Sequence, residues 1–324
     1  MSESASGTGG HEGARRRIDV HHHIAPPEYL AEVGPTINPP LKSWSLAKAI
    51  EDMDEGHVAT AIVSVTQIAV RIASAERARR VARACNEFAA RMVADHKGRF
   101  GMFVALPLPD IEGSLREIEY GLDQLKADGV GLYTSYHDKW LGDPAFAPVF
   151  EELNRRGTVC YVHPATPDCC HNLVPGVGDA AIEYGTDTTR AIARMVFSGS
   201  AQRYRAVRMI WSHAGGTMPF LAERFIRMAQ QKEYAGLLPD GFVPEAQRFF
   251  YDTAQASNRY ALSSARALIP ASNFVFGTDY PYRTAKEHVE GLAHCGVFDA
   301  AELRAIDRDN LASLLPQYRE SAAR

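Results

Sequence analysis

The chain has 324 residues, of which 46% are hydrophobic and 23% are charged, and its 35 basic and 39 acidic side chains give a formal net charge of −4. Its apolar runs stop far short of the roughly 18 residues that a membrane-spanning helix needs. A mildly acidic balance also lacks the basic field that neutralises nucleic-acid phosphates. We therefore expect neither a membrane nor a nucleic acid as a partner.

The amino-terminal segment is rich in Ser and Gly and contains no apolar stretch of the kind found in secretion signals. We expect residues 1–16 to form a disordered tail, followed by one domain over residues 17–324. The number of cysteines, five, is odd, and their spacing matches no disulfide framework. Both features favour reduced thiols and a cytoplasmic location. Cys169 and Cys170 are adjacent, but without a CxxC pair we interpret them as ordinary thiols rather than metal ligands.

After the tail, short β-branched runs alternate with stretches of helical periodicity, and this alternation occurs eight times. Short apolar runs between helices are typical of parallel strands that are buried on both faces. In chain order, we predict strands at residues 17–22, 60–65, 101–106, 129–133, 159–163, 208–213, 250–253 and 274–279.

The segments between these strands have the repeat of amphipathic helices. Val81, Cys85, Phe88 and Met92 recur at intervals of three and four residues, and residues 115–125 contain a second such set. Because no linker divides the chain, the eight units predict a single-domain α/β fold, the closed (β/α)₈ or TIM barrel. An open doubly wound sheet is the alternative, but it would normally carry a Gly-rich phosphate loop after the first strand.

Two connections are longer than a plain barrel requires. They cover residues 25–48 after the first strand and residues 166–184 after the fifth. The carboxyl ends of barrel strands form the face that carries active sites. We expect these two segments to form the walls of a substrate site or a lid.

Polar residues occur at the ends of the first, fifth, sixth and eighth strands, which meet at one face of a barrel. Because side chains alternate along a strand, His21 and His23 point the same way and His22 points oppositely. With His163 and Asp279, this pair supplies three nitrogens and one oxygen to a divalent ion. That ligand set favours Zn²⁺, with Mn²⁺ as the alternative, and leaves a position for water or substrate.

The chain resembles the metal-dependent amidohydrolase superfamily, and in particular its amidohydrolase-2 branch of decarboxylases, typified by aminocarboxymuconate semialdehyde decarboxylase. The overall likeness is greatest to the 6-methylsalicylate decarboxylase group. The matching motifs span nearly the whole chain in the family's order, at residues 18–23, 163–164, 187–190, 212–216, Pro219, Arg224, Asp252, Thr253 and 276–281.

The resemblance implies that His21, His23, His163 and Asp279 hold one metal ion and that His213 stands beside it as the acid/base residue. It implies that Arg224 reaches the active site of a neighbouring subunit in a homodimer or a larger homo-oligomer. It also places Arg190 and Tyr280 in matching motifs, and we predict that both contact substrate.

Two departures narrow the prediction. The fourth strand lacks the lysine that bridges two metals in many hydrolytic members, so we expect one ion. Ala49 stands where the aminocarboxymuconate enzyme has a carboxylate-binding arginine, which argues against a second carboxylate on the substrate. With these departures, the resemblance implies non-oxidative decarboxylation of a small hydroxy-substituted aromatic acid, such as 6-methylsalicylate, with release of CO₂.

The proton that replaces the carboxylate comes from His213 or Asp279, and we favour His213. Metal-dependent hydrolysis of a lactone or an amide on the same barrel is the first alternative. A metal-occupied scaffold that binds small acids without converting them is the second, although His213 exceeds what binding alone requires.

Overall fold

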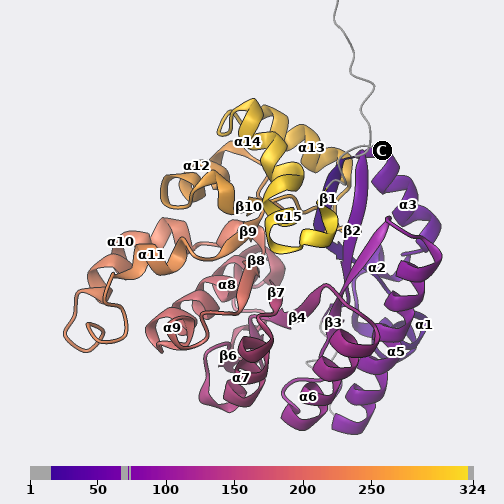
Figure 1. Ribbon diagram of the computed structural model, residues 1–324, viewed down its shortest axis with the longest axis horizontal. Coiled ribbons are helices and arrows are strands. Elements are labelled where there is room, and N and C mark those ends of the chain that lie inside the picture. Colours follow the sequence, from indigo (N-terminus) through magenta and orange to yellow (C-terminus); the bar gives the residue numbers. More distant parts are fainter. Residues whose placement is uncertain (1–15, 67–71, 73, 320–324) are drawn as a thin grey trace, which may run out of the picture.

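The computed structural model describes residues 16–66, 72 and 74–319, so residues 1–15 of the predicted tail lie outside the described residues. Eight parallel strands follow one another around a single sheet, with helices on its outer side (Figure 1). In order they are β1 (Arg17–His23), β2 (Val58–Ser64), β3 (Phe100–Ala105), β4 (Gly129–Tyr133), β7 (Val159–His163), β8 (Arg208–Trp211), β9 (Phe250–Asp252) and β10 (Phe274–Val275).

Backbone hydrogen bonds join the last strand region to the first and close the sheet. The amide of Val20 donates to the carbonyl of Phe276 at 3.0 Å, and the amide of His23 donates to the carbonyl of Tyr280 at 2.8 Å. In return, the amide of Asp279 donates to the carbonyl of His21 at 2.8 Å. The predicted (β/α)₈ barrel is therefore confirmed, and the open doubly wound sheet is excluded.

The helices form on the predicted amphipathic stretches. In α5 (Ala75–Asp95), Val81, Cys85 and Met92 are buried against the barrel, and the Ser74 side chain caps the first turn. The other helices are α1 (Pro27–Val33), α2 (Pro39–Lys42), α3 (Leu46–Glu55), α6 (Ile111–Glu119), α7 (Ala147–Arg156), α8 (Asp179–Phe197), α9 (Ser200–Arg203), α10 (Met218–Ala229), α11 (Phe242–Ala246), α12 (Arg259–Leu268), α13 (Ala285–His294), α14 (Ala300–Arg304) and α15 (Asn310–Leu314). A hairpin of β5 (Ser135–Tyr136) and β6 (Lys139–Trp140) follows β4.

The barrel interior is packed with side chains. Ile18, Val20, Ile62 and Ile210 belong to one buried cluster with Phe103, whose ring stacks on that of Tyr161 at a centroid distance of 5.4 Å. A second, larger cluster fills the layer between strands and helices. A filled interior leaves the ends of the strands as the place for a site.

Three strands are shorter than predicted. Strand β8 ends at Trp211 instead of residue 213, β9 ends at Asp252 instead of residue 253, and β10 ends at Val275 instead of residue 279. Beyond these points His213 and Asp279 adopt left-handed backbone angles, with φ of 54° and 62°. Non-glycine residues rarely adopt such angles, and they concentrate at functional sites.

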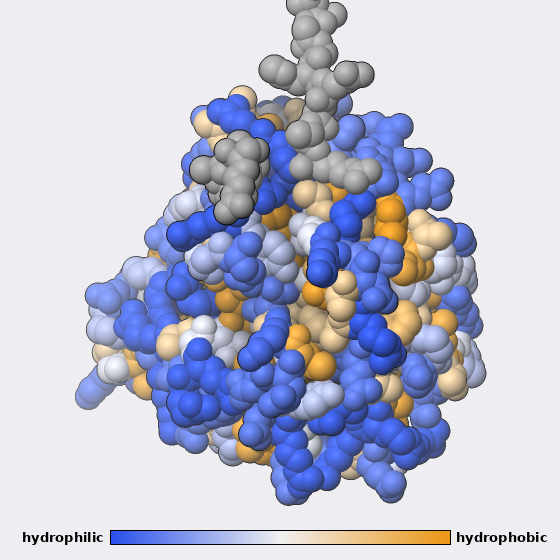
Figure 2. Space-filling model, turned by 45° about the vertical axis from the view of Figure 1, so that its right-hand side comes forward, coloured by the Kyte–Doolittle hydropathy of each residue, from blue (hydrophilic) through white to orange (hydrophobic). Residues whose placement is uncertain are grey.

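Most of the surface seen in Figure 2 is hydrophilic, with small hydrophobic groups between the charged residues. Among the described residues, no helix combines the length and apolar character needed to cross a bilayer.

Candidate metal centre and its cavity

The four predicted ligands meet at the carboxyl end of the barrel. One ligand atom from each of His21, His23, His163 and Asp279 lies within 4.8 Å of all the others, and all four residues are buried. The Nε2 atoms of His21 and His23 are 3.0 Å apart. Asp279 Oδ1 lies 3.1 Å from the first of these nitrogens and 3.0 Å from the second. Two imidazole lone pairs this close to a carboxylate oxygen require a cation or a proton between them.

Hydrogen bonds on the far side of the rings fix which nitrogens face the centre. His21 Nδ1 donates to Asp252 Oδ2 at 2.8 Å, and His163 Nδ1 donates to the carbonyl of Pro164 at 2.8 Å. His23 Nδ1 lies 3.1 Å from Ser64 Oγ. Because a carboxylate and a carbonyl only accept, Nδ1 keeps its proton in both rings, and Nε2 is the nitrogen through which His21 and His163 can bind a metal.

The electrostatics of the cluster favour a positive charge at its centre. Burial lowers the pKa of His21, but the carboxylates of Asp279 and Asp252 outweigh burial and raise it to about 10. Burial lowers the pKa of His23 to about 4 and that of His163 well below its usual value. Burial opposes ionisation of Asp279, yet the charge of His21 holds the pKa of this carboxyl well below its usual range. At neutral pH His23 and His163 are therefore neutral and Asp279 is ionised, which are the forms that bind a divalent cation, whereas His21 holds a proton that such a cation would displace.

Asp252, at the end of β9, organises two sides of the cluster. Its Oδ2 accepts from His21 and also from the Tyr161 hydroxyl at 3.1 Å. Its Oδ1 accepts from the backbone amides of His213 at 2.8 Å and Ala254 at 3.0 Å. One buried carboxylate therefore orients a predicted ligand and anchors the backbone of the predicted acid/base residue.

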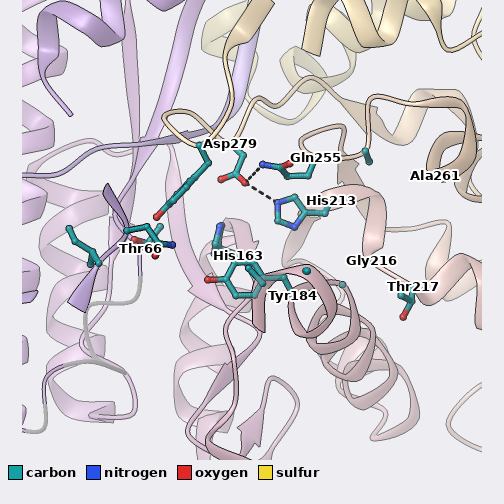
Figure 3. A pocket seen from close by; sticks show the side chains of 16 residues that line it. Thr66, His163, Tyr184, His213, Gly216, Thr217, Gln255, Ala261 and Asp279 are labelled. Carbon is teal, nitrogen blue, oxygen red and sulfur yellow. Dashed lines mark hydrogen bonds and ion pairs between the residues drawn. The ribbon is translucent and has the colours of Figure 1, made fainter. Parts of the chain in front are cut away.

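His213 lies beside the cluster, on the turn that follows β8. Its Nε2 is 3.5 Å from Asp279 Oδ2 and makes no hydrogen bond within the described part of the chain. Gln255 donates from Nε2 to the same Asp279 oxygen at 2.9 Å. Figure 3 shows the three side chains converging at the inner end of a cavity. Asp279 thus uses one oxygen toward His21 and His23 and the other toward Gln255 and His213.

The cavity above the cluster has a volume of about 530 Å³. Both long connections contribute to its lining, as predicted: Ile37 and Asn38 come from the first, and Ala180, Ala181 and Tyr184 come from the second. Figure 3 shows Tyr184 beside His163. The remaining lining residues are Thr66, His163, Gly185, His213, Gly216, Thr217, Gln255, Ala256, Ala261, Asp279 and Tyr282. Neither Lys nor Arg is among these lining residues.

Three predicted substrate contacts lie outside this lining. Arg190 donates to Glu183 Oε2 at 3.1 Å and faces a separate groove. The Tyr280 ring stacks on His22 at a centroid distance of 4.6 Å, and Arg224 is exposed on α10. None of these three residues lines the cavity, so their contact with substrate stays a prediction. Sequence reasoning in turn missed Gln255 and Thr66, which belong to no recognisable motif.

The profile of the Amidohydro_2 family, described as amidohydrolase, matches residues 18–316. Decarboxylase yanB of Aspergillus niger is 32% identical over 94% of this chain and 89% of its own length. The 6-methylsalicylic acid decarboxylase of Penicillium expansum is 33% identical over 82% of this chain and 85% of its own. A dihydroxybenzoic acid decarboxylase from Polaromonas sp. JS666, solved with bound manganese and 2-nitroresorcinol, superposes with a TM-score of 0.79 at 24% identity, covering 94% of this chain and 98% of that one.

Proposed function

Because the chain belongs to the amidohydrolase family, we propose that it is a metal-dependent decarboxylase that releases CO₂ from a hydroxy-substituted aromatic acid of the 6-methylsalicylate type. The observation that carries this proposal is the buried cluster of three imidazoles and one carboxylate beneath a cavity, with His213 Nε2 beside it and 3.5 Å from Asp279 Oδ2. Relatives at more than 30% identity that are named decarboxylases support the same reaction.

We propose that His21, His23, His163 and Asp279 hold one divalent ion, which would orient the carboxylate and the neighbouring hydroxyl of the substrate and offset their negative charge. The three nitrogen ligands favour Zn²⁺. The manganese bound to the Polaromonas enzyme makes Mn²⁺ the alternative. Metal analysis of the purified protein distinguishes the two ions.

The chain's own residues supply the proton. Loss of CO₂ directly from an arene would leave an unstabilised aryl anion, so the ring carbon that carries the carboxylate must be protonated first. His213 Nε2 makes no hydrogen bond among the described residues and can donate this proton, and the ionised Asp279 Oδ2, 3.5 Å away, can stabilise the protonated imidazole before the transfer. After protonation the ring is a transient dienone, and departure of CO₂ restores aromaticity.

The cavity favours a substrate with a single carboxylate. Among the described residues, its lining includes no Lys or Arg for a second acid group, whereas Ile37, Ala256 and Ala261 provide apolar contacts for the ring and its alkyl substituent. We propose that a homodimer or a larger homo-oligomer adds a positive charge at the cavity mouth through the exposed Arg224 of a second copy. Sedimentation of wild-type protein and of Arg224→Ala tests this assembly. We also propose that the enzyme is cytoplasmic.

The decisive experiment is an assay for evolved CO₂ with a panel of salicylates, run beside a panel of lactones and amides. We expect CO₂ from 6-methylsalicylate and no turnover of the lactones. Ring opening of a lactone without gas would replace the proposal by a hydrolase. Tight binding of salicylates without conversion would replace it by a binding protein.

A further inference from the structure

Two adjacent cysteines in one of the two long connections have no part in the proposed reaction. Cys169 and Cys170 lie in the loop between β7 and α8, and their sulfur atoms are 2.9 Å apart. Cys169 is the one exposed cysteine of the five, whereas Cys170 is buried. The pair therefore combines an accessible thiol with a second thiol in direct contact.

The surrounding loop holds the two sulfurs together. The amide of Cys169 donates to Asp138 Oδ1 at 3.0 Å, and the amide of Cys170 donates to the carbonyl of Pro167 at 2.9 Å. Beside them, His137 Nδ1 lies 2.9 Å from Asp168 Oδ2. These contacts tie the dithiol to the turn between β5 and β6, so that the short sulfur distance belongs to an ordered turn.

The protonation of Cys169 favours reaction at Cys170. The hydrogen bond with Cys170 raises the pKa of Cys169 to about 11, so Cys169 stays protonated at neutral pH. Because the thiolate and not the thiol is the nucleophile, we assign the first step to Cys170 and the second to Cys169.

We propose that Cys169 and Cys170 are a redox modification site at which a hydroperoxide converts the dithiol into a reversible disulfide between neighbouring residues. The Cys170 thiolate attacks the peroxide oxygen, giving a sulfenic acid and releasing an alkoxide or hydroxide that takes up a proton. The sulfur of Cys169 then attacks the sulfur of Cys170, and the displaced hydroxide leaves as water with the Cys169 proton. Two thiols are oxidised and one peroxide is reduced to an alcohol, or to water, plus one water.

The same loop connects the dithiol to the cavity, and this part of the inference rests on the proposed function. Asp179, the first residue of α8, accepts from His171 Nδ1 at 3.0 Å and from the amide of Asn172 at 2.8 Å, directly after the cysteines. One residue further, Ala180 and Ala181 line the cavity. The eight-membered ring of such a disulfide forces the turn into a new conformation, and the displacement reaches this wall.

The test treats the metal-loaded full-length protein with one equivalent of hydrogen peroxide, followed by non-reducing peptide mapping and thiol counting. We expect the peptide with residues 169 and 170 to lose two hydrogen atoms, the thiol count to fall by two, and dithiothreitol to restore both. Cys169→Ser should stop at a sulfenic acid on Cys170 that dimedone traps. The matched control Cys295→Ser, which removes a buried cysteine, should behave like the parent.

In the parent we expect oxidation to raise KM about tenfold or more, because an apolar pocket contact the size of one methylene is worth about that factor. The rise should reverse with dithiothreitol and be absent from Cys169→Ser and Cys170→Ser. Unchanged thiols at residues 169 and 170 after treatment would overturn the modification site. A disulfide with unchanged KM would overturn its coupling to the cavity. The first result does not depend on whether salicylates prove to be the substrates, because thiols and mass are measured without turnover, whereas the KM comparison requires a substrate identified by the CO₂ assay.

Discussion

Replacing Asp252 by Asn tests whether this carboxylate sets the chemistry of His21. The amides of His213 and Ala254 belong to the backbone and cannot turn away from Oδ1, so the Asn carbonyl oxygen must take that position. The Asn NH₂ group then faces His21 Nδ1, which donates to Asp252 in the parent. To avoid two opposed donors, His21 must accept at Nδ1 and carry its proton on Nε2. That proton occupies the Nε2 lone pair through which His21 would bind the metal.

The expected magnitude follows from this change of tautomer. Loss of such an outer partner weakens metal binding by about 10–100-fold, which corresponds to about 1.4–2.7 kcal/mol. Metal affinity would be measured by competition with a chromophoric chelator, and circular dichroism would show that the barrel is folded. Tyr161→Phe is the matched control, because it removes the other donor to Oδ2 and keeps the Asp252 partner of His21. It should change the affinity less than about threefold. An Asn variant that folds and binds metal as tightly as the parent would refute the reasoning.

Three further predictions use the same structure. His213→Ala should lower kcat by about 10²–10⁴-fold through loss of the proton donor while metal content stays at the parent level, and equal loss of metal would contradict its role. Gly216→Ala should lower the free energy of unfolding by about 2 kcal/mol or more, measured by urea denaturation, because Gly216 has a φ of 64° and a Cβ there would overlap the carbonyl of Gly185. Burial raises the pKa of Asp52 to about 6, although the amide of Ala285 opposes the shift. The folded state therefore binds the proton more tightly than the unfolded state, and this contribution to stability is lost as the pH rises from about 4 to about 6. Asp52→Asn should thus become more stable relative to the parent over that range, and a constant difference in stability would contradict the shift.

Much of the barrel and of the metal centre could be predicted because both depend on simple periodicities. His21 and His23 lie on one side of a strand through alternation alone, and the strand ends place His163 and Asp279 nearby. The role of Asp252 could not be predicted, because it follows from hydrogen bonds with His21, which is 231 residues away in the chain.

The ends of the last strands were predicted too long for a similar reason. A β-branched run does not show that His213 and Asp279 will adopt left-handed backbone angles, since tertiary contacts impose them. The sequence also could not place Arg190, because its ion pair with Glu183 turns it toward the groove behind α8.

The closure of the barrel gives the metal centre a second consequence. His23 and Asp279, whose side chains meet at 3.0 Å, are 256 positions apart, and they flank the seam where the first and last strand regions join. A growing polypeptide therefore has an incomplete ligand set until almost all of it has been synthesised. An ion bound there would link the first and last strand regions across the seam. All four ligands could bind it only after these two regions have come together.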